Sequence, residues 1–146
     1  MIEGNSPHET LEVSRVFAAT KERVFRAWTS PEELKKWWRP GEGWTTPVAE
    51  VDLRVGGKFS LGAKPPVGDL HLVRGEFQEV IPPDKLVYTW QVEGSGPERS
   101  IVTVEFRADG ERTRVRIIHE MLTEKSAATS RIGWDGVLSS LQRVLG

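Results

Sequence analysis

The chain has 146 residues, 38% of them hydrophobic and 28% charged, which is the size and composition of one globular domain. Its 20 basic and 21 acidic side chains give a formal net charge of −1, which argues against nucleic acid or an anionic membrane as the main partner. The absence of cysteine excludes a disulfide framework, thiolate metal sites and cysteine nucleophiles.

The N-terminal residues are polar and predict a flexible tail over residues 1–8, followed by one domain over residues 9–146. They contain no apolar run of signal-peptide length, so we expect a cytoplasmic protein. No apolar run approaches the ~18 residues that a membrane span requires.

The first part of the domain predicts a strand and two short helices. Glu9 to Phe17 alternates between apolar and polar residues, as a half-buried strand does. A helix is predicted from Lys21 to Trp28, with Thr20 as its N-cap. Ser30-Pro31-Glu32-Glu33 predicts the start of a second helix, in which Glu33 would return the capping bond of a capping box.

From Thr46 onward, short runs of alternating polarity are separated by turn residues, which predicts a series of strands. Gly75 lies inside one of these runs and predicts a bulge. Asp109-Gly110 predicts a hairpin turn. The expected strands cover residues 48–53, 58–63, 69–80, 86–92, 101–106 and 113–120.

The last segment, Glu124 to Leu145, predicts a long helix capped by Thr123. Its apolar stripe consists of Trp134, Leu138, Leu141 and Leu145. Gly133 and Gly136 each cost ~1 kcal/mol in a helix interior relative to alanine. We therefore expect either a close backbone approach or room for a ligand beside them.

This order of elements predicts an α+β fold. Sequential short strands with tight turns favour antiparallel pairing, and the first strand would pair most simply beside the last. The expected architecture is a curved antiparallel sheet of about seven strands wrapped around the long C-terminal helix, with two short helices after the first strand.

Several segments together resemble a known family. They are Val24-Phe25-Arg26-Ala27-Trp28-Thr29-Ser30-Pro31-Glu32-Glu33-Leu34 with Trp37-Trp38, Glu50 to Phe59, Ile81-Pro82-Pro83, Leu86 to Trp90, His119-Glu120 and Gly133-Trp134. In this order they resemble the activator of heat-shock-protein-90 ATPase homologue-like family, within the START-like (SRPBCC) superfamily, from about Leu11 to Leu145.

The resemblance implies a helix-grip fold with a deep cavity between the sheet and the long helix. Related proteins of the superfamily bind lipids, hormones or polyketide-like molecules, and some of them catalyse reactions on these ligands. The family name itself comes from a eukaryotic cochaperone, so the resemblance also admits a chaperone-linked function.

His119 is the polar residue of greatest interest. It shares strand parity with Val115 and Ile117 and should therefore point to the buried, concave face. An imidazole there could bind a ligand or act as an acid or base. The favoured interpretation is a structural histidine that is bonded to a neighbouring hydroxyl or to water.

Aromatic residues supply most of the other candidates for a ligand site. Trp37 and Trp38 are adjacent on a helix and point about 100° apart, so one could pack in the core while the other faces a cavity mouth or solvent. Trp44 could close over a ligand or plug the sheet edge. Tyr88 and Trp90 should face inward, either to orient a ligand or to fill the core. The expected ligand-binding residues are Trp37, Trp38, Trp44, Phe59, Tyr88, Trp90, His119, Trp134 and Leu138.

No residue pattern has the spacing of a metal site, a cofactor site or a nucleophile with its base, so we expect neither a metal nor a cofactor and name no catalytic residue. Three functions stay open. The first is the binding of a small hydrophobic or amphipathic ligand. The second is an enzyme of the cyclase, dehydratase or hydrolase type acting in the same cavity. The third is a chaperone-associated interaction module, and the sequence also leaves a homodimer open.

Overall fold

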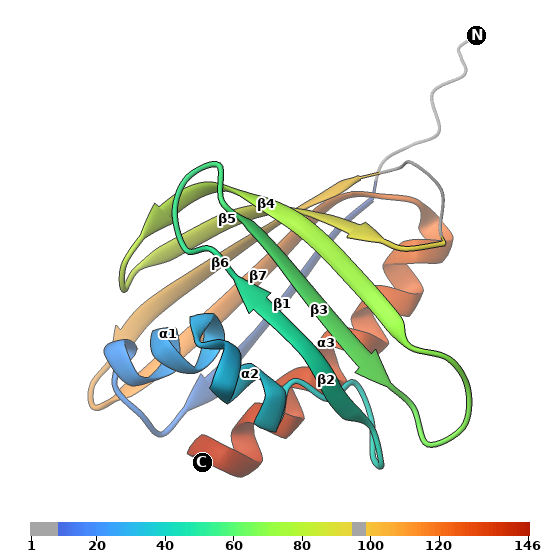
Figure 1. Ribbon diagram of the computed structural model, residues 1–146. Coiled ribbons are helices and arrows are strands. Elements are labelled where there is room, and N and C mark those ends of the chain that lie inside the picture. Colours follow the sequence, from blue (N-terminus) through green and yellow to red (C-terminus); the bar gives the residue numbers. More distant parts are fainter. Residues whose placement is uncertain (1–8, 95–98) are drawn as a thin grey trace, which may run out of the picture.

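The computed structural model describes residues 9–94 and 99–146. The expected tail over residues 1–8 lies outside the described residues. Within them the chain forms one curved antiparallel sheet and three helices, as Figure 1 shows.

The sheet contains seven strands among the described residues, and its two edges are formed by the first two strands of the chain. In chain order the strands are β1 (Glu9–Phe17), β2 (Thr45–Val51), β3 (Lys58–Lys64), β4 (His71–Ile81), β5 (Lys85–Val92), β6 (Ser100–Asp109) and β7 (Arg112–Leu122). Their spatial order is β1-β7-β6-β5-β4-β3-β2. The predicted pairing of the first strand with the last is confirmed, with Val13 opposite Ile117.

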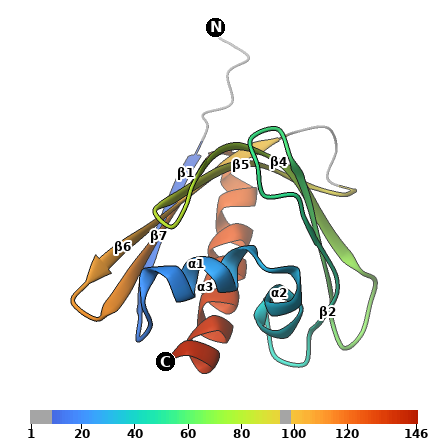
Figure 2. The ribbon, with the colours of Figure 1, turned by 60° about the vertical axis from the view of Figure 1, so that its left-hand side comes forward.

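The helices are α1 (Lys21–Thr29), α2 (Pro31–Trp37) and α3 (Glu124–Leu145). Figure 2 shows the sheet arching over α3, which runs along the inside of the arch, while α1 and α2 lie across its open side. The predicted α+β architecture is therefore confirmed. Thr20 and Thr123 cap α1 and α3 as expected, since each side chain accepts a bond from a backbone N–H in the first turn.

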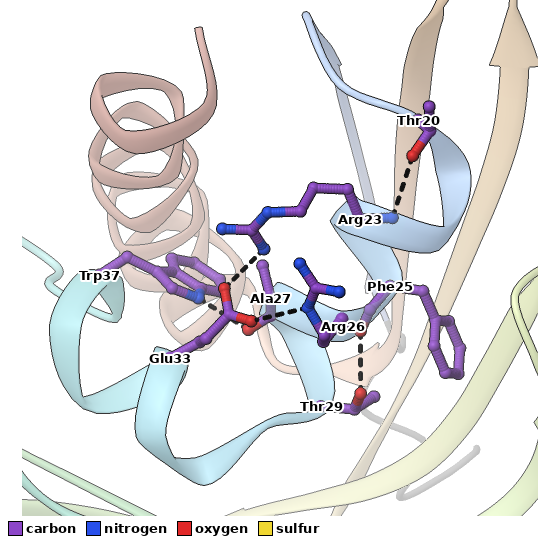
Figure 3. Close-up of polar contacts among 8 residues, drawn as sticks. All are labelled: Thr20, Arg23, Phe25, Arg26, Ala27, Thr29, Glu33 and Trp37. Atoms are coloured by element: carbon purple, nitrogen blue, oxygen red, sulfur yellow. Dashed lines mark hydrogen bonds and ion pairs between the residues drawn. The ribbon is translucent and has the colours of Figure 1, made fainter.

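The capping box predicted at the start of α2 is wrong. Ser30 makes no side-chain capping bond. The Glu33 carboxylate instead accepts from Arg23 Nη1 at 2.5 Å and from Arg26 Nε at 3.2 Å, as Figure 3 shows. A carboxylate with two guanidinium partners nearby has no need of the backbone N–H, so Glu33 joins α2 to α1 rather than capping α2.

Gly75 allows Thr89 and Phe59 to pack closely against its backbone, and the bulge predicted at Gly75 is not there. The register of β4 against β5 shifts between Phe77 and Glu79, a few residues further along the strand. A Cβ at position 75 would overlap the Thr89 carbonyl oxygen and the ring of Phe59. Glycine is therefore required there because backbone and ring occupy the space of any side chain.

Aromatic rings fill the space between the arch and α3. Trp134 of α3 lies at the centre, with its ring 5.2 Å from Trp90, 5.7 Å from Trp38 and 6.4 Å from Trp28. Around these rings pack the buried aliphatic side chains of the strands. A pocket of about 20 Å³, which is room for a water molecule, lies among these rings.

Candidate functional site

A much larger cavity, of about 420 Å³, lies at one end of the arch. It opens between the N-terminal half of α3 and the adjoining ends of β5, β6 and β7. The open space is thus displaced from the centre of the molecule, where a deep cavity was expected. The lining residues are Trp90, Val92, Arg99, Ser100, Met121, Leu122, Thr123, Lys125, Ser126, Thr129 and Ser130.

The two walls of this cavity differ in chemistry. The sheet supplies large apolar side chains, whereas α3 supplies hydroxyls from Ser126, Thr129 and Ser130, which recur at helical spacing along one face. Arg99 and Lys125 add positive charge, and none of the lining residues that the structure describes carries a carboxylate. A molecule with an apolar body and a polar group matches this arrangement.

A bulge in β7 shapes the apolar wall. Leu122 pairs with Glu9 and His119 with Leu11, so β7 has one residue more than β1 between these pairs. Met121 within the bulge has φ 65°, the left-handed region that a non-glycine residue adopts at a cost of ~1–2 kcal/mol. The extra residue lets both Met121 and Leu122 line the cavity, although simple alternation would turn Leu122 outward.

A chain of hydrogen bonds connects the cavity to the buried core. Trp134 Nε1 donates to His119 Nδ1 at 3.0 Å, and His119 Nε2 lies 2.7 Å from Ser100 Oγ. Ser100 Oγ in turn donates to the Trp90 carbonyl oxygen at 3.3 Å. His119 is fully buried, whereas Ser100, which is 7% exposed, lines the cavity.

The direction of this chain is determined by Trp134, because an indole N–H can only donate. His119 Nδ1 must therefore accept, and the neutral imidazole carries its proton on Nε2, which donates to Ser100 Oγ. Burial lowers the pKa of His119 to about 4, so the ring is neutral near pH 7.

The same geometry prevents His119 from activating Ser100 as a nucleophile. A general base would need a free lone pair on Nε2 and a proton on Nδ1. That proton would point at the indole N–H of Trp134, which offers no lone pair. Trp134 takes the position that an acceptor occupies in a catalytic triad, so the arrangement suits binding rather than acyl transfer.

Most of the residues predicted for a ligand site lie elsewhere. Trp90 alone among them lines the large cavity, and His119 lies behind its wall. Trp38, Phe59 and Tyr88 line the void of about 20 Å³. Of the others, Trp37, Trp134 and Leu138 are buried in the core, and Trp44 is half-buried with its ring 5.1 Å from that of His71.

Two of these buried side chains use their polar atoms within the protein. Trp37 Nε1 donates to the Ala27 carbonyl oxygen at 2.8 Å, drawn in Figure 3. Tyr88 Oη accepts from Trp28 Nε1 at 3.4 Å, and burial raises the pKa of the phenol. Both contacts join α1 to a neighbouring element, so these residues hold the fold together.

Sequence reasoning missed Ser100, Met121 and the hydroxyl-bearing face of α3. The usable signal was the asymmetry of the last helix. Its apolar stripe begins only at Trp134, and the preceding turns carry Ser126, Thr129 and Ser130 where a fully packed helix would bury apolar residues. Where a helix lacks the apolar stripe, as α3 does in its N-terminal half, it is not packed against a hydrophobic core.

Two further features bear on the kind of site present. Within residues 9–94 and 99–146, no three His, Asp or Glu side chains gather closely enough to hold a metal ion. Across the same residues no helix combines the length and apolar character that crossing a bilayer demands.

Solved structures of other proteins share this architecture over nearly their whole length. CV1439 from Chromobacterium violaceum is 28% identical, with a TM-score of 0.84 over 93% of this chain and 96% of that one. PFC0360w from Plasmodium falciparum, described as an HSP90 activator, is 27% identical, with a TM-score of 0.74 over 92% and 94%. Ms6760 from Mycobacterium smegmatis, at 20% identity, shares the fold with a TM-score of 0.82 over 94% and 90%.

No curated protein matches the chain. The model of one family, Activator of Hsp90 ATPase homolog 1-like protein, matches residues 18–146. Of the described residues, this stretch includes the three helices, strands β2 to β7 and those that line the cavity. With the helix-grip architecture and these structural relatives, this match shows that the chain belongs to the family of Activator of Hsp90 ATPase homolog 1-like proteins within the START-like fold.

Proposed function

We propose that this protein binds a small amphipathic or hydrophobic molecule in the cavity between the N-terminal half of α3 and the ends of β5, β6 and β7. The observation that carries this proposal is the contrast between two spaces. The pocket among the aromatic rings holds about 20 Å³, whereas the end cavity holds about 420 Å³, within the range of small-molecule sites.

Strain at the cavity wall supports the same assignment. Met121 keeps a left-handed backbone conformation, and its side chain is 48% exposed at the cavity. An unfavourable conformation of this kind tends to occur where function requires it. Its thioether is flexible enough to fit ligands of differing shape.

Catalysis in the cavity has less support. The only imidazole near it, among the described residues, is His119, and its proton sits on the nitrogen that faces Ser100. Because no carboxylate occurs among the described lining residues, these residues provide no other general base for neutral pH.

The test uses the neutral probe N-phenyl-1-naphthylamine, whose fluorescence rises in apolar surroundings. We expect saturable binding to one site. Ser130→Phe places a ring in the cavity and should weaken binding at least ~10-fold. Ala128→Phe is the matched control, because Ala128 is an exposed residue of the same helix that does not line the cavity. Absence of saturable binding, or equal affinity in both variants, would overturn the proposal.

A chaperone-linked function is the second candidate. It is favoured by the 27% identity to the Plasmodium falciparum protein described as an HSP90 activator. The purified chain should then accelerate ATP hydrolysis by an Hsp90 protein in a dose-dependent manner. An unchanged hydrolysis rate at a saturating concentration of the chain would rule this candidate out.

A further inference from the structure

We propose that the cavity selects amphiphiles whose polar end is an anionic hydrogen-bond acceptor, specifically a carboxylate. This inference rests on the proposed function and adds the chemical class of the ligand. Two independent features carry it: the direction of the hydrogen-bond chain that ends at Ser100, and the charge of the cavity lining.

The first feature leaves Ser100 with a proton to donate. Trp134 can only donate to His119, and His119 therefore donates to Ser100 Oγ. The remaining Ser100 O–H points to the Trp90 carbonyl oxygen across 3.3 Å, a long distance for a hydroxyl donor. A ligand acceptor at normal hydrogen-bond distance would make a better partner for the hydroxyl of Ser100, a residue that is 7% exposed and lines the cavity.

Ser100 Oγ also keeps one lone pair open, because His119 Nε2–H uses only the other. The O–H of Ser100, held by a long bond to Trp90, favours a carbonyl, carboxylate or ether oxygen of the ligand. The choice between an anionic and a cationic ligand depends on the charge of the lining.

The second feature is the sign of the charge. Neither Arg99 nor Lys125 forms an ion pair with a described carboxylate, although both line the cavity. The N-terminal end of α3 adds the positive end of its helix dipole. Glu124, the acidic residue of the first turn, is exposed and does not line the cavity. The described part of the lining therefore attracts a ligand carboxylate and repels a ligand cation.

The apolar body of the ligand follows from the sheet wall. Trp90, Val92, Met121 and Leu122 present a continuous apolar surface opposite the hydroxyls of α3. An unbranched alkyl or aryl group lying on this wall loses its contact with water, which drives binding in proportion to the buried area.

The test compares three ligands with the same alkyl tail: decanoate, decan-1-ol and decyltrimethylammonium, each titrated into the intact chain by calorimetry below its micelle concentration. We expect decanoate to bind at least ~10-fold more tightly than decan-1-ol, with an affinity that falls as salt is raised. Decyltrimethylammonium should bind most weakly.

Variants locate the effect. Ser100→Ala should reduce decanoate affinity ~5- to 10-fold and decan-1-ol affinity by less, because the alcohol oxygen accepts from Ser100 but carries no charge. The double variant Arg99→Gln with Lys125→Gln should reduce decanoate affinity ~5- to 10-fold while decan-1-ol affinity stays the same. Because decan-1-ol reports an intact cavity, a variant that merely unfolds would lose both ligands. Lys35→Gln on α2, an exposed lysine that does not line the cavity, is the control and should change neither affinity.

The outcomes separate the two proposals. Equal binding of all three ligands, or tightest binding of the cation, overturns the carboxylate inference and leaves the proposed function standing. Failure of all three ligands to bind overturns the proposed function, and this inference with it. Decanoate selectivity that survives both the Ser100 and the double variant overturns the residue assignment made here.

Discussion

Two glycines of α3 provide a matched test of the packing around the long helix. Gly133 and Gly136 lie in adjacent turns, and each should cost ~1 kcal/mol relative to alanine on helix propensity alone. The structure nevertheless predicts that alanine at the two positions changes the free energy of unfolding in opposite directions. A Cβ at Gly133 would meet no atom within 4 Å, whereas a Cβ at Gly136 would overlap the Pro40 carbonyl oxygen and lie 2.7 Å from its carbon.

The magnitudes follow from these surroundings. Gly133→Ala should gain the full propensity difference and stabilise the protein by ~1 kcal/mol. Gly136→Ala gains the same amount but forces α3 away from the backbone at Pro40, and overpacking of this kind costs ~1–3 kcal/mol. Because the obstacle is backbone rather than a flexible side-chain end, we expect the upper part of that range and a net loss of ~2 kcal/mol.

The assay is urea unfolding of both variants and the parent chain, followed by tryptophan fluorescence. The free energies of unfolding of the two variants should differ by ~3 kcal/mol, or ~6–12 °C in melting temperature for a chain of this size. Equal effects of the two substitutions, or a stabilising Gly136→Ala, would refute the close approach of α3 to the segment between α2 and β2.

Three further predictions concern the hydrogen-bond chain through His119, the left-handed conformation of Met121 and the contact between α1 and α2. Because burial lowers the pKa of His119 from about 6.5 to about 4, the unfolded chain takes up a proton that the folded chain excludes between these values. Unfolding free energy should therefore fall by ~3 kcal/mol as the pH drops through this window, and His119→Gln, measured by urea unfolding, should show a correspondingly flatter pH profile. Met121→Gly relieves the left-handed conformation and should raise the melting temperature or leave it unchanged, while calorimetry shows weaker decanoate binding; a clear loss of stability would contradict the assignment of strain. Glu33→Gln should cost ~1 kcal/mol in urea unfolding because it weakens two arginine contacts, whereas Asp52→Asn, at an exposed pair, should change stability by less than ~0.5 kcal/mol.

The fold could be predicted from the sequence because the patterns that indicate its helices, strands and turns are local. Alternation of apolar residues, turn residues such as Asp109-Gly110 and the caps Thr20 and Thr123 each depend on a few neighbouring positions. Their order then left one simple arrangement of a sheet around a helix, and the structure shows that arrangement.

The position of the site was harder to predict because it depends on how completely side chains pack the interior. The alternation along the strands correctly predicted that Tyr88 and His119 point inward. Alternation does not tell whether an inward side chain lines a cavity or packs against another ring. Trp134 occupies the centre that a ligand would need, and only contact between distant elements reveals this. The bulge that brings Met121 and Leu122 to the cavity likewise depends on pairing with β1.

The location of the ligand site can be tested most directly by a ¹H–¹⁵N correlation spectrum of the labelled chain titrated with decanoate. We predict saturable shifts of the backbone amides of Ser100, Met121 and Ser126 around the end cavity, while those of Phe59 and Tyr88 beside the small interior void stay in place. The largest shifts at Phe59 and Tyr88, with none at Ser100 or Ser126, would contradict a site at the end of the arch and place the ligand in the aromatic interior.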